Sequence, residues 1–113
     1  MTAAIPLILG SGSPRRKKIL QELGCAFRAV AAEAAEIHGA TDPVRTVAEN
    51  ALAKYRACRR RHAAAALITA DTLVWFEGRL IGKPVDLEEA AGFLRSFSGR
   101  VQTVFTGLAL GMP

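Results

Sequence analysis

The first part of the chain has a short apolar run, then a polar turn, then apolar residues at helical spacing, which predicts a strand followed by a helix. The apolar run at residues 5–9 is typical of a short buried strand. Ser13 and Pro14 then predict a helix start, because serine caps a first turn and proline lacks only an N–H that would be unpaired there. The helix is expected to end at Gly24, and a weaker alternation over residues 27–31 indicates a second strand.

A second cap-and-proline pair, Asp42-Pro43, predicts a long helix after a polar loop at residues 33–41. Its apolar positions recur at helical spacing and are expected to share one face; they are Val44, Val47, Ala48, Ala51 and Tyr55. Arginines crowd its last turns, where positive charge suits the helix dipole.

The remaining pattern predicts strands on both sides of a third helix. Residues 67–76 form a nearly continuous apolar run, typical of a central strand, and Glu77-Gly78 predicts a turn into a strand at residues 79–81. Asp86 caps a helix whose expected apolar stripe is Leu87, Ala90, Ala91 and Leu94, and residues 101–110 are a last β-rich run. This order predicts a single α/β domain over residues 1–113, with a mixed β-sheet flanked by helices.

Composition narrows the class of protein and of partner. Half of the 113 residues are hydrophobic, which suits one globular domain, and the formal charge of +5 favours an anionic partner: nucleic acid, a membrane surface or a phosphorylated metabolite. The apolar stretch at residues 3–9 is far shorter than the roughly 20 residues that span a bilayer, so no membrane partner is expected. Cys25 and Cys58 form no metal-binding or redox pair, and reduced thiols suit a cytoplasmic protein.

The turn at residues 11–14 leads into a helix that carries four cations in its first turns: Arg15, Arg16, Lys17 and Lys18. A helix N-terminus offers unpaired N–H groups that suit a phosphate, whereas cations there oppose the helix dipole. A bound polyanion would resolve this conflict. A capped surface helix with a solvated basic face explains the same residues, so both interpretations remain open.

Asp71 lies inside an apolar run, where a carboxylate is costly unless it is paired, hydrogen-bonded or bound to a metal. This favours an acid that holds Mg²⁺ or orients a water, with the capping of a backbone turn as the structural alternative. Lys83, held between Gly82 and Pro84, suits a phosphate clamp, and Lys54 lies on the long predicted helix. For each lysine taken alone, an ordinary exposed side chain is the better explanation.

Several short motifs, each weak alone, together resemble the Maf family of nucleotide pyrophosphatases. They occur in the family's order over nearly the whole chain: Ser11-Gly12-Ser13-Pro14-Arg15-Arg16, Glu49-Asn50-Ala51 with Lys54, Ala70-Asp71-Thr72, Gly82-Lys83-Pro84, and Ser98-Gly99-Arg100 leading to Thr106-Gly107. The resemblance implies a Maf/ITPase-like fold. It also implies hydrolysis of a nucleoside triphosphate between its α and β phosphates, giving a monophosphate and pyrophosphate, with Mg²⁺ or Mn²⁺ as cofactor.

The resemblance further implies a role for individual residues. The expected phosphate-binding residues are Ser11, Arg15, Arg16, Lys54 and Lys83. Asp71 matches the catalytic base or metal ligand, and Glu36 falls where the family has another acid, expected at the metal. A nucleoside triphosphate substrate, a cytoplasmic location and a homodimer are implied as well.

The sequence departs from the family pattern in two respects. Gln102 stands near the position where many members have a histidine. The chain also covers only somewhat more than the first half of the family domain, so a domain truncated at its C-terminus is expected. Within the family, the motifs around Arg15 and Asp71 resemble the branch acting on dTTP and UTP, whereas residues 103–110 resemble the branch acting on 7-methyl-GTP.

Two functions of other classes also fit these residues. One is an inactive family fragment, and the other is a basic protein that binds nucleic acid through residues 15–18 and 56–61. Nucleic-acid binding would weaken steeply with salt and ignore metal, whereas a pyrophosphatase should need metal and discriminate among bases.

Overall fold

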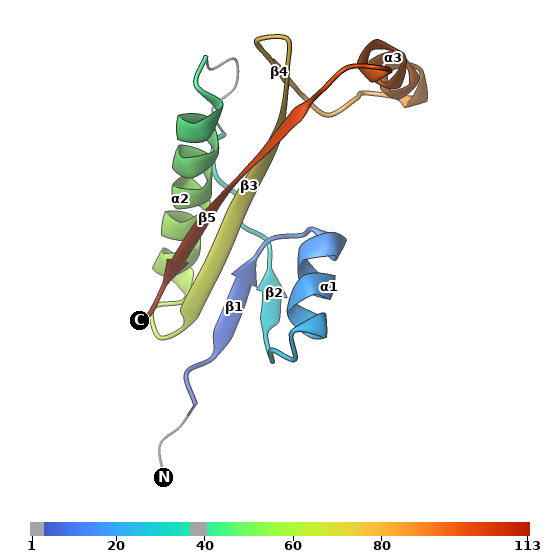
Figure 1. The fold of residues 1–113 in the computed structure, drawn as a ribbon. Helices are drawn as coiled ribbons and strands as arrows, with labels where there is room; N and C mark the ends of the chain where they lie inside the picture. Colours follow the sequence, from blue (N-terminus) through green and yellow to red (C-terminus); the bar gives the residue numbers. More distant parts are fainter. Residues whose placement is uncertain (1–3, 37–40) are drawn as a thin grey trace.

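The computed structural model describes residues 4–36 and 41–113, which form three helices and a five-stranded mixed sheet (Figure 1). The strands are β1 (Leu7–Gly10), β2 (Arg28–Val30), β3 (Ala66–Phe76), β4 (Arg79–Ile81) and β5 (Thr103–Gly111). The helices are α1 (Pro14–Glu22), α2 (Pro43–Arg61) and α3 (Leu87–Phe97). The predicted α/β class with a mixed sheet is confirmed. The first strand begins later than the apolar run suggested, and part of the loop predicted at 33–41 lies outside the described residues.

Strand β3 is the centre of the sheet and organises every other strand except β2. Strand β1 runs parallel to residues 66–69 of β3, and β2 runs parallel to β1. Strand β5 is antiparallel to residues 67–75 of β3, and β4 is antiparallel to residues 74–76. Because β5 occupies one edge of β3 over nearly its whole length, β1 and β4 must share the other edge. Residues 70–73 of β3 therefore lie between β1 and β4, where this edge has no described strand partner.

The helices begin where local capping allows. Each predicted cap accepts a hydrogen bond from the backbone N–H three residues later: Ser13 from Arg16 at 3.4 Å, Asp42 from Arg45 at 3.1 Å and Asp86 from Glu89 at 2.8 Å. Gly24 follows the end of α1 with φ +76°, a conformation that glycine adopts without a Cβ penalty.

Helix α2 packs against β3 and β5 and builds the main core with them. Val47 and Ala51 are buried on this side of the helix, facing the buried side of β3. The prediction that Val44 and Ala48 share this buried face was wrong, since Val44 is 60% exposed and Ala48 is also exposed. The buried face also includes Thr46, Asn50 and Cys58, so it is turned toward Asn50 and away from Val44.

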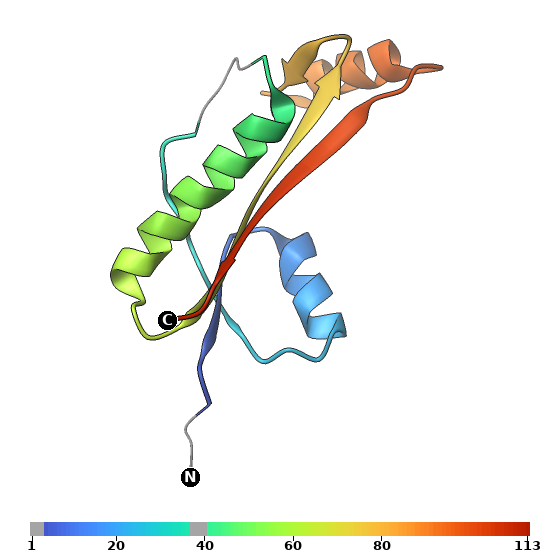
Figure 2. The same cartoon turned by 60° about the vertical axis from the view of Figure 1, so that its left-hand side comes forward.

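Helices α1 and α2 lie on opposite sides of the sheet (Figure 2). Helix α3 lies beyond the far end of the β3–β4 hairpin, away from α1 and the lower part of α2 (Figure 1). The apolar stripe predicted for α3 is not buried, since Leu87 is 88% exposed and no residue of α3 is buried. The ring of Phe97 instead contacts the ring of Phe76 edge-on, with centroids 4.8 Å apart, and joins α3 to the end of β3.

Candidate active site

A pocket of about 620 Å³ opens where the edge of β3 has no strand partner among the described residues. The turn before α1, the middle of α2, the centre of β3 and the loop after β4 all contribute to it. Its lining residues are Ser13, Arg15, Arg16, Glu36, Thr46, Asn50, Lys54, Asp71, Thr72, Leu73, Val74, Leu80, Ile81, Gly82, Lys83 and Pro84. The structure thus brings together six of the seven residues predicted for the site, while Ser11 lies behind the lining.

Asp71 is the most deeply placed acid of this pocket, at 8% exposure. Its Oδ2 accepts a hydrogen bond of 3.1 Å from Asn50 Nδ2, and its Oδ1 contacts Lys54 Nζ at 3.3 Å. Both oxygens therefore have a partner on α2, which explains how a carboxylate is tolerated inside an apolar strand. Each oxygen keeps a further lone pair for a water or an ion.

Lys54 lies between the two acids that the sequence assigned to a metal. Its Nζ is 3.0 Å from Glu36 Oε1 and 3.3 Å from Asp71 Oδ1, and it also donates to the carbonyl oxygen of Ala70 at 3.3 Å. Residues 4–36 and 41–113 contain no group of three or more histidines, cysteines and acids that could hold a metal ion. Mg²⁺ commonly binds one or two protein carboxylates and completes its shell with substrate phosphates and water. Glu36 and Asp71 are carboxylates of the type that Mg²⁺ uses, but they are joined through Lys54 Nζ, and the described residues form no assembled metal site.

Arg16 ties the turn before α1 to the central strand. Its guanidinium donates to Ser11 Oγ at 3.1 Å, to the Ala70 carbonyl oxygen at 3.4 Å and to Thr72 Oγ1 at 3.0 Å. Ser11 Oγ also accepts from the Ser13 N–H at 3.1 Å, so the serine organises the turn from behind the pocket. Arginine carries five N–H donors, so Arg16 retains donors for a ligand while it bridges the gap.

Two cations of the pocket have no hydrogen-bond or ion-pair partner among the described residues. Arg15 on the first turn of α1 and Lys83 after β4 form no hydrogen bond or ion pair with any residue that the structure describes. With Arg16 and Lys54 they make four cations against the two carboxylates, which leaves the pocket with a net charge of +2. Such a concave positive surface attracts polyanions.

Sequence reasoning assigned no individual role to several lining residues. Asn50 was noticed only within a motif, although it lies one helical turn before Lys54 and therefore on the same face. Leu80 and Ile81 form part of an apolar wall that no local signal distinguished from ordinary strand residues. Gln102 lies elsewhere, where its Nε2 donates to the carbonyl oxygens of Phe97 and Arg100.

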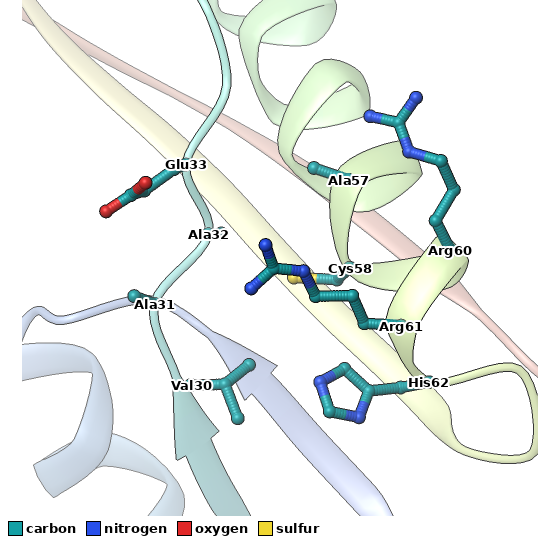
Figure 3. Close-up of a pocket in the computed structure, with 9 residues that line it drawn as sticks. All are labelled: Val30, Ala31, Ala32, Glu33, Ala57, Cys58, Arg60, Arg61 and His62. Carbon is teal, nitrogen blue, oxygen red and sulfur yellow. The ribbon is translucent and has the colours of Figure 1, made fainter.

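A second cavity, of about 470 Å³, lies at the other end of α2, beside the end of β2 (Figure 3). Arg61 extends across Cys58, and His62 lies near Val30. Burial raises the pKa of the Cys58 thiol above its ordinary value, an effect that the charge of Arg61 opposes. None of the residues predicted for the site lies here.

The fold and the site together define an α/β protein with a cation-rich pocket beside the carboxyl end of a parallel strand, which is where open sheets hold phosphorylated ligands. None of the described helices combines the length and the apolar character needed to cross a membrane.

The chain belongs to the Maf-like protein family, whose model matches residues 6–113. It is 44% identical over 107 residues to a dTTP/UTP pyrophosphatase of Deinococcus radiodurans, covering 95% of this chain and 55% of that protein. It is 41% identical over 109 residues to a dTTP/UTP pyrophosphatase of Akkermansia muciniphila, covering 96% of this chain and 58% of the relative. The chain therefore spans about half the length of the curated relatives that it matches.

Among solved structures, the chain resembles a nucleoside-triphosphatase, or dITP/XTP pyrophosphatase, of Mycobacterium abscessus. The match has a TM-score of 0.41 and 16% sequence identity, and it covers 96% of this chain and 74% of the other.

Proposed function

We propose that this chain carries the phosphate-binding and catalytic residues of a nucleoside triphosphate pyrophosphatase that acts on dTTP and UTP. The observation that carries the proposal is the pocket itself, in which four cations line the same cavity as the buried carboxylate of Asp71. The names of the relatives from Deinococcus and Akkermansia support the same reaction and the same bases.

In the proposed reaction, water attacks the α phosphorus, the bond from that phosphorus to the bridging oxygen breaks, and pyrophosphate leaves. Arg15 and Lys83 are proposed to bind phosphate oxygens, because they line the pocket without a partner among the residues that the structure describes. Arg16 and Lys54 contribute charge while they hold the turn and the acids in place. The developing negative charge is thus met by cations that are already in position.

Asp71 is proposed to accept the proton of the attacking water. Asn50 and Lys54 fix its two oxygens from α2, so the carboxylate is oriented before substrate arrives. Glu36 and Asp71 would together hold a divalent ion, Mg²⁺ or Mn²⁺, which when bound polarises the phosphoryl oxygens. The apolar wall at Leu80 and Ile81 is the part of the pocket suited to the nucleoside.

The reaction is tested by measuring pyrophosphate release from dTTP, UTP, 7-methyl-GTP and the purine triphosphates, with Mg²⁺, with Mn²⁺ and with a chelator. The measurement uses the chain alone and also the chain joined to the part of the Deinococcus relative that it does not match. We expect metal-dependent turnover of dTTP and UTP. Preferred turnover of 7-methyl-GTP would move the chain to the other branch, and metal-independent, salt-sensitive binding of oligonucleotides would favour nucleic-acid recognition instead.

Asp71→Asn separates catalysis from binding. Asparagine keeps the size of the side chain but cannot take a proton from water, so we expect turnover to fall by about 10²–10⁴-fold with triphosphate binding largely retained. Glu77→Gln is the matched control, because Glu77 is an exposed carboxylate paired with Arg100 outside the pocket. Turnover by Asp71→Asn at a near wild-type rate would show that Asp71 is structural.

Arg15→Ala should act on binding instead. It removes a charge-assisted contact that exists already in the ground state, so KM should rise more than kcat falls. Arg56→Ala removes the same charge from the exposed side of α2 and serves as its control. An equal rise in KM in the two variants would show that Arg15 acts only through the net positive charge of the protein and not through a contact with phosphate.

A further inference from the structure

The gap in the edge of β3 opens the main chain of the central strand to the pocket. Strand β1 pairs with β3 as far as Thr69, and β4 pairs with it from Val74 onward. Among the residues that the structure describes, no strand pairs with residues 70–73 on this edge. An unpaired strand edge presents backbone N–H and C=O groups. Here that edge lies in the cation-rich pocket.

The direction of each backbone group along β3 follows from hydrogen bonds beside the gap. Successive residues of a strand aim their N–H and C=O groups at opposite edges, so every second residue faces the same edge. The Ala66 N–H donates to the carbonyl oxygen of Pro6, just before β1. The Ala70 carbonyl oxygen accepts from Arg16 and Lys54 in the gap. Even-numbered residues of β3 therefore face β1 and the gap, whereas odd-numbered residues face β5.

Thr72 is the even-numbered residue in the middle of the gap, and it lines the pocket. It pairs in register with Thr106 of β5, and the two Oγ1 atoms are 2.9 Å apart. In an antiparallel pair the side chains come closest where the two residues exchange no backbone hydrogen bonds. The Thr72 N–H and C=O therefore face the gap, without a strand partner among the described residues. The neighbouring Asp71 faces Gly107 on β5 instead.

Cations contact the strand beside the Thr72 N–H. Arg16 and Lys54 both donate to the Ala70 carbonyl oxygen, at 3.4 and 3.3 Å, and Arg16 also donates to Thr72 Oγ1 at 3.0 Å. Because the Ala70 oxygen already accepts from two cations, it repels an incoming phosphate little. Lys83 would come opposite Thr72 if the register between β3 and β4 continued by one more pair. An anion that enters the gap thus meets both these cations and the N–H.

The size of the gap suits a small ligand better than a polypeptide strand. Its four residues, 70–73, rise about 3.3 Å each and span only about 13 Å. Strands β1 and β4 bound it at its two ends, and strands usually have about five or six residues. A phosphate group needs only one or two donors of this edge.

We propose that the Thr72 N–H donates a hydrogen bond to a non-bridging oxygen of the α phosphorus. This inference rests on the proposed function, because it takes a nucleoside triphosphate as the ligand. Asp71 is proposed to accept the proton of the attacking water, so the attacked phosphorus lies near it, and Thr72 is the next residue of the same strand. A backbone N–H held in a sheet is already oriented when negative charge develops on that oxygen, so it stabilises the transition state.

Thr72→Pro tests this role, since proline has no N–H. The N–H faces away from β5, so its loss breaks no hydrogen bond of that ladder. Thr72→Val is the matched control, because it keeps the N–H and, like proline, lacks the hydroxyl group that bonds Arg16 and Thr106. The kinetics use whichever of the two chains described above turns over dTTP. We expect Thr72→Pro to lower kcat by about 10²–10³-fold relative to Thr72→Val, with KM changed less than about threefold.

A second substitution removes the same N–H without fixing the backbone. Incorporation of 2-hydroxyisovaleric acid, the α-hydroxy analogue of valine, at position 72 replaces the N–H by an ester oxygen. It should reproduce the loss of kcat relative to Thr72→Val, and it decides the matter if circular dichroism shows that Thr72→Pro does not fold.

Amide hydrogen exchange observes the N–H directly. Without ligand, the Thr72 amide should exchange at least about tenfold faster than the amides of Asp71 and Leu73, which face β5. In the chain used for kinetics, Mg²⁺ and a dTTP analogue with CH₂ in place of the α–β bridging oxygen should slow the Thr72 amide by at least about tenfold. The Asp71 and Leu73 amides should change little.

The outcomes separate this inference from the proposed function. Equal kcat values for Thr72→Pro and Thr72→Val, or a Thr72 amide that the bound analogue leaves unchanged, would overturn the role of this N–H and leave the pyrophosphatase reaction standing. A failure of both wild-type chains to turn over or bind any nucleoside triphosphate would overturn the proposed function, and this inference with it.

Discussion

Gly107 should be among the positions of the sheet least tolerant of a larger residue. It pairs in register with Asp71, and α2 crosses directly over it. A Cβ at this position would lie 2.6 Å from the carbonyl carbon of Val47 and 2.9 Å from the backbone nitrogen of Ala48, and closer still to the Val47 carbonyl oxygen. These neighbours are helix backbone, which cannot rotate away as a side chain can.

The free-energy cost of Gly107→Ala follows from this geometry. Relief of the clash requires α2 to move away from β5 by nearly 1 Å, since ordinary contacts of a Cβ begin at 3.4 Å. Overpacking of a well-packed core costs about 1–3 kcal/mol, and a clash with backbone belongs at the upper end, near 3 kcal/mol. The same movement would displace Asn50 and Lys54, which hold Asp71 from α2.

Urea unfolding followed by circular dichroism measures this cost. With a slope of about 1.5 kcal/mol per molar, a loss near 3 kcal/mol lowers the midpoint by about 2 M. Gly12→Ala is the first control, because nothing lies within 4 Å of its added Cβ, and its effect should stay within about 0.5 kcal/mol. Gly92→Ala, inside α3, should instead stabilise by up to about 1 kcal/mol through helix propensity. A Gly107→Ala midpoint no lower than that of Gly12→Ala would refute the close approach of α2 to β5.

Two other predictions concern stability. Arg16→Gln removes hydrogen bonds to three partners and should lower the free energy of unfolding by about 1–2 kcal/mol. The control Arg15→Gln should change the free energy of unfolding by less than about 0.5 kcal/mol. Equal effects of the two variants in urea unfolding would contradict the bridging role of Arg16. Burial raises the pKa of Cys58 in the folded chain, so its contribution to stability is complete below the ordinary thiol pKa of about 8.5 and is lost as pH rises from there through the folded value. Cys58→Ala should therefore lose less stability at alkaline pH than the wild type, when the free energy of unfolding is measured against pH. Cys25→Ala, at an exposed site, should keep the wild-type pH dependence. The same pH dependence in both variants would assign the loss of stability to other groups.

The order of elements and the helix starts could be predicted from the sequence, because their causes are local. A cap such as Ser13 or Asp42 bonds an N–H only three residues away, so the residues that decide it are adjacent in the chain. The buried carboxylate of Asp71 was equally visible, since an acid within an apolar run is costly wherever the strand lies. Local physics therefore pointed to the turn before α1 and to Asp71, whereas Glu36 was named only through the resemblance to the Maf family.

The apolar stripe of α3 shows where a local pattern misleads. The helical spacing of Leu87 and Leu94 indicates that the two side chains share one face of the helix. Whether another segment covers that face depends on residues far away in the chain. Here the helix lies beyond the hairpin and contacts it chiefly through Phe97. The apolar residues do share one face of α3, but periodicity alone could not predict that this face is exposed.

Amphipathic pattern, caps and the buried acid were determined by the sequence itself, because each depends on neighbours within a few residues. Only the tertiary structure decided that β1 and β4 share one edge of β3 and leave residues 70–73 open between them. The bridge from Arg16 to Thr72, 56 residues later, and the contact of Gly107 with α2 exist only because that pairing register brings distant segments together. The register of a strand depends on pairing along its whole length, so it cannot be predicted from any single residue.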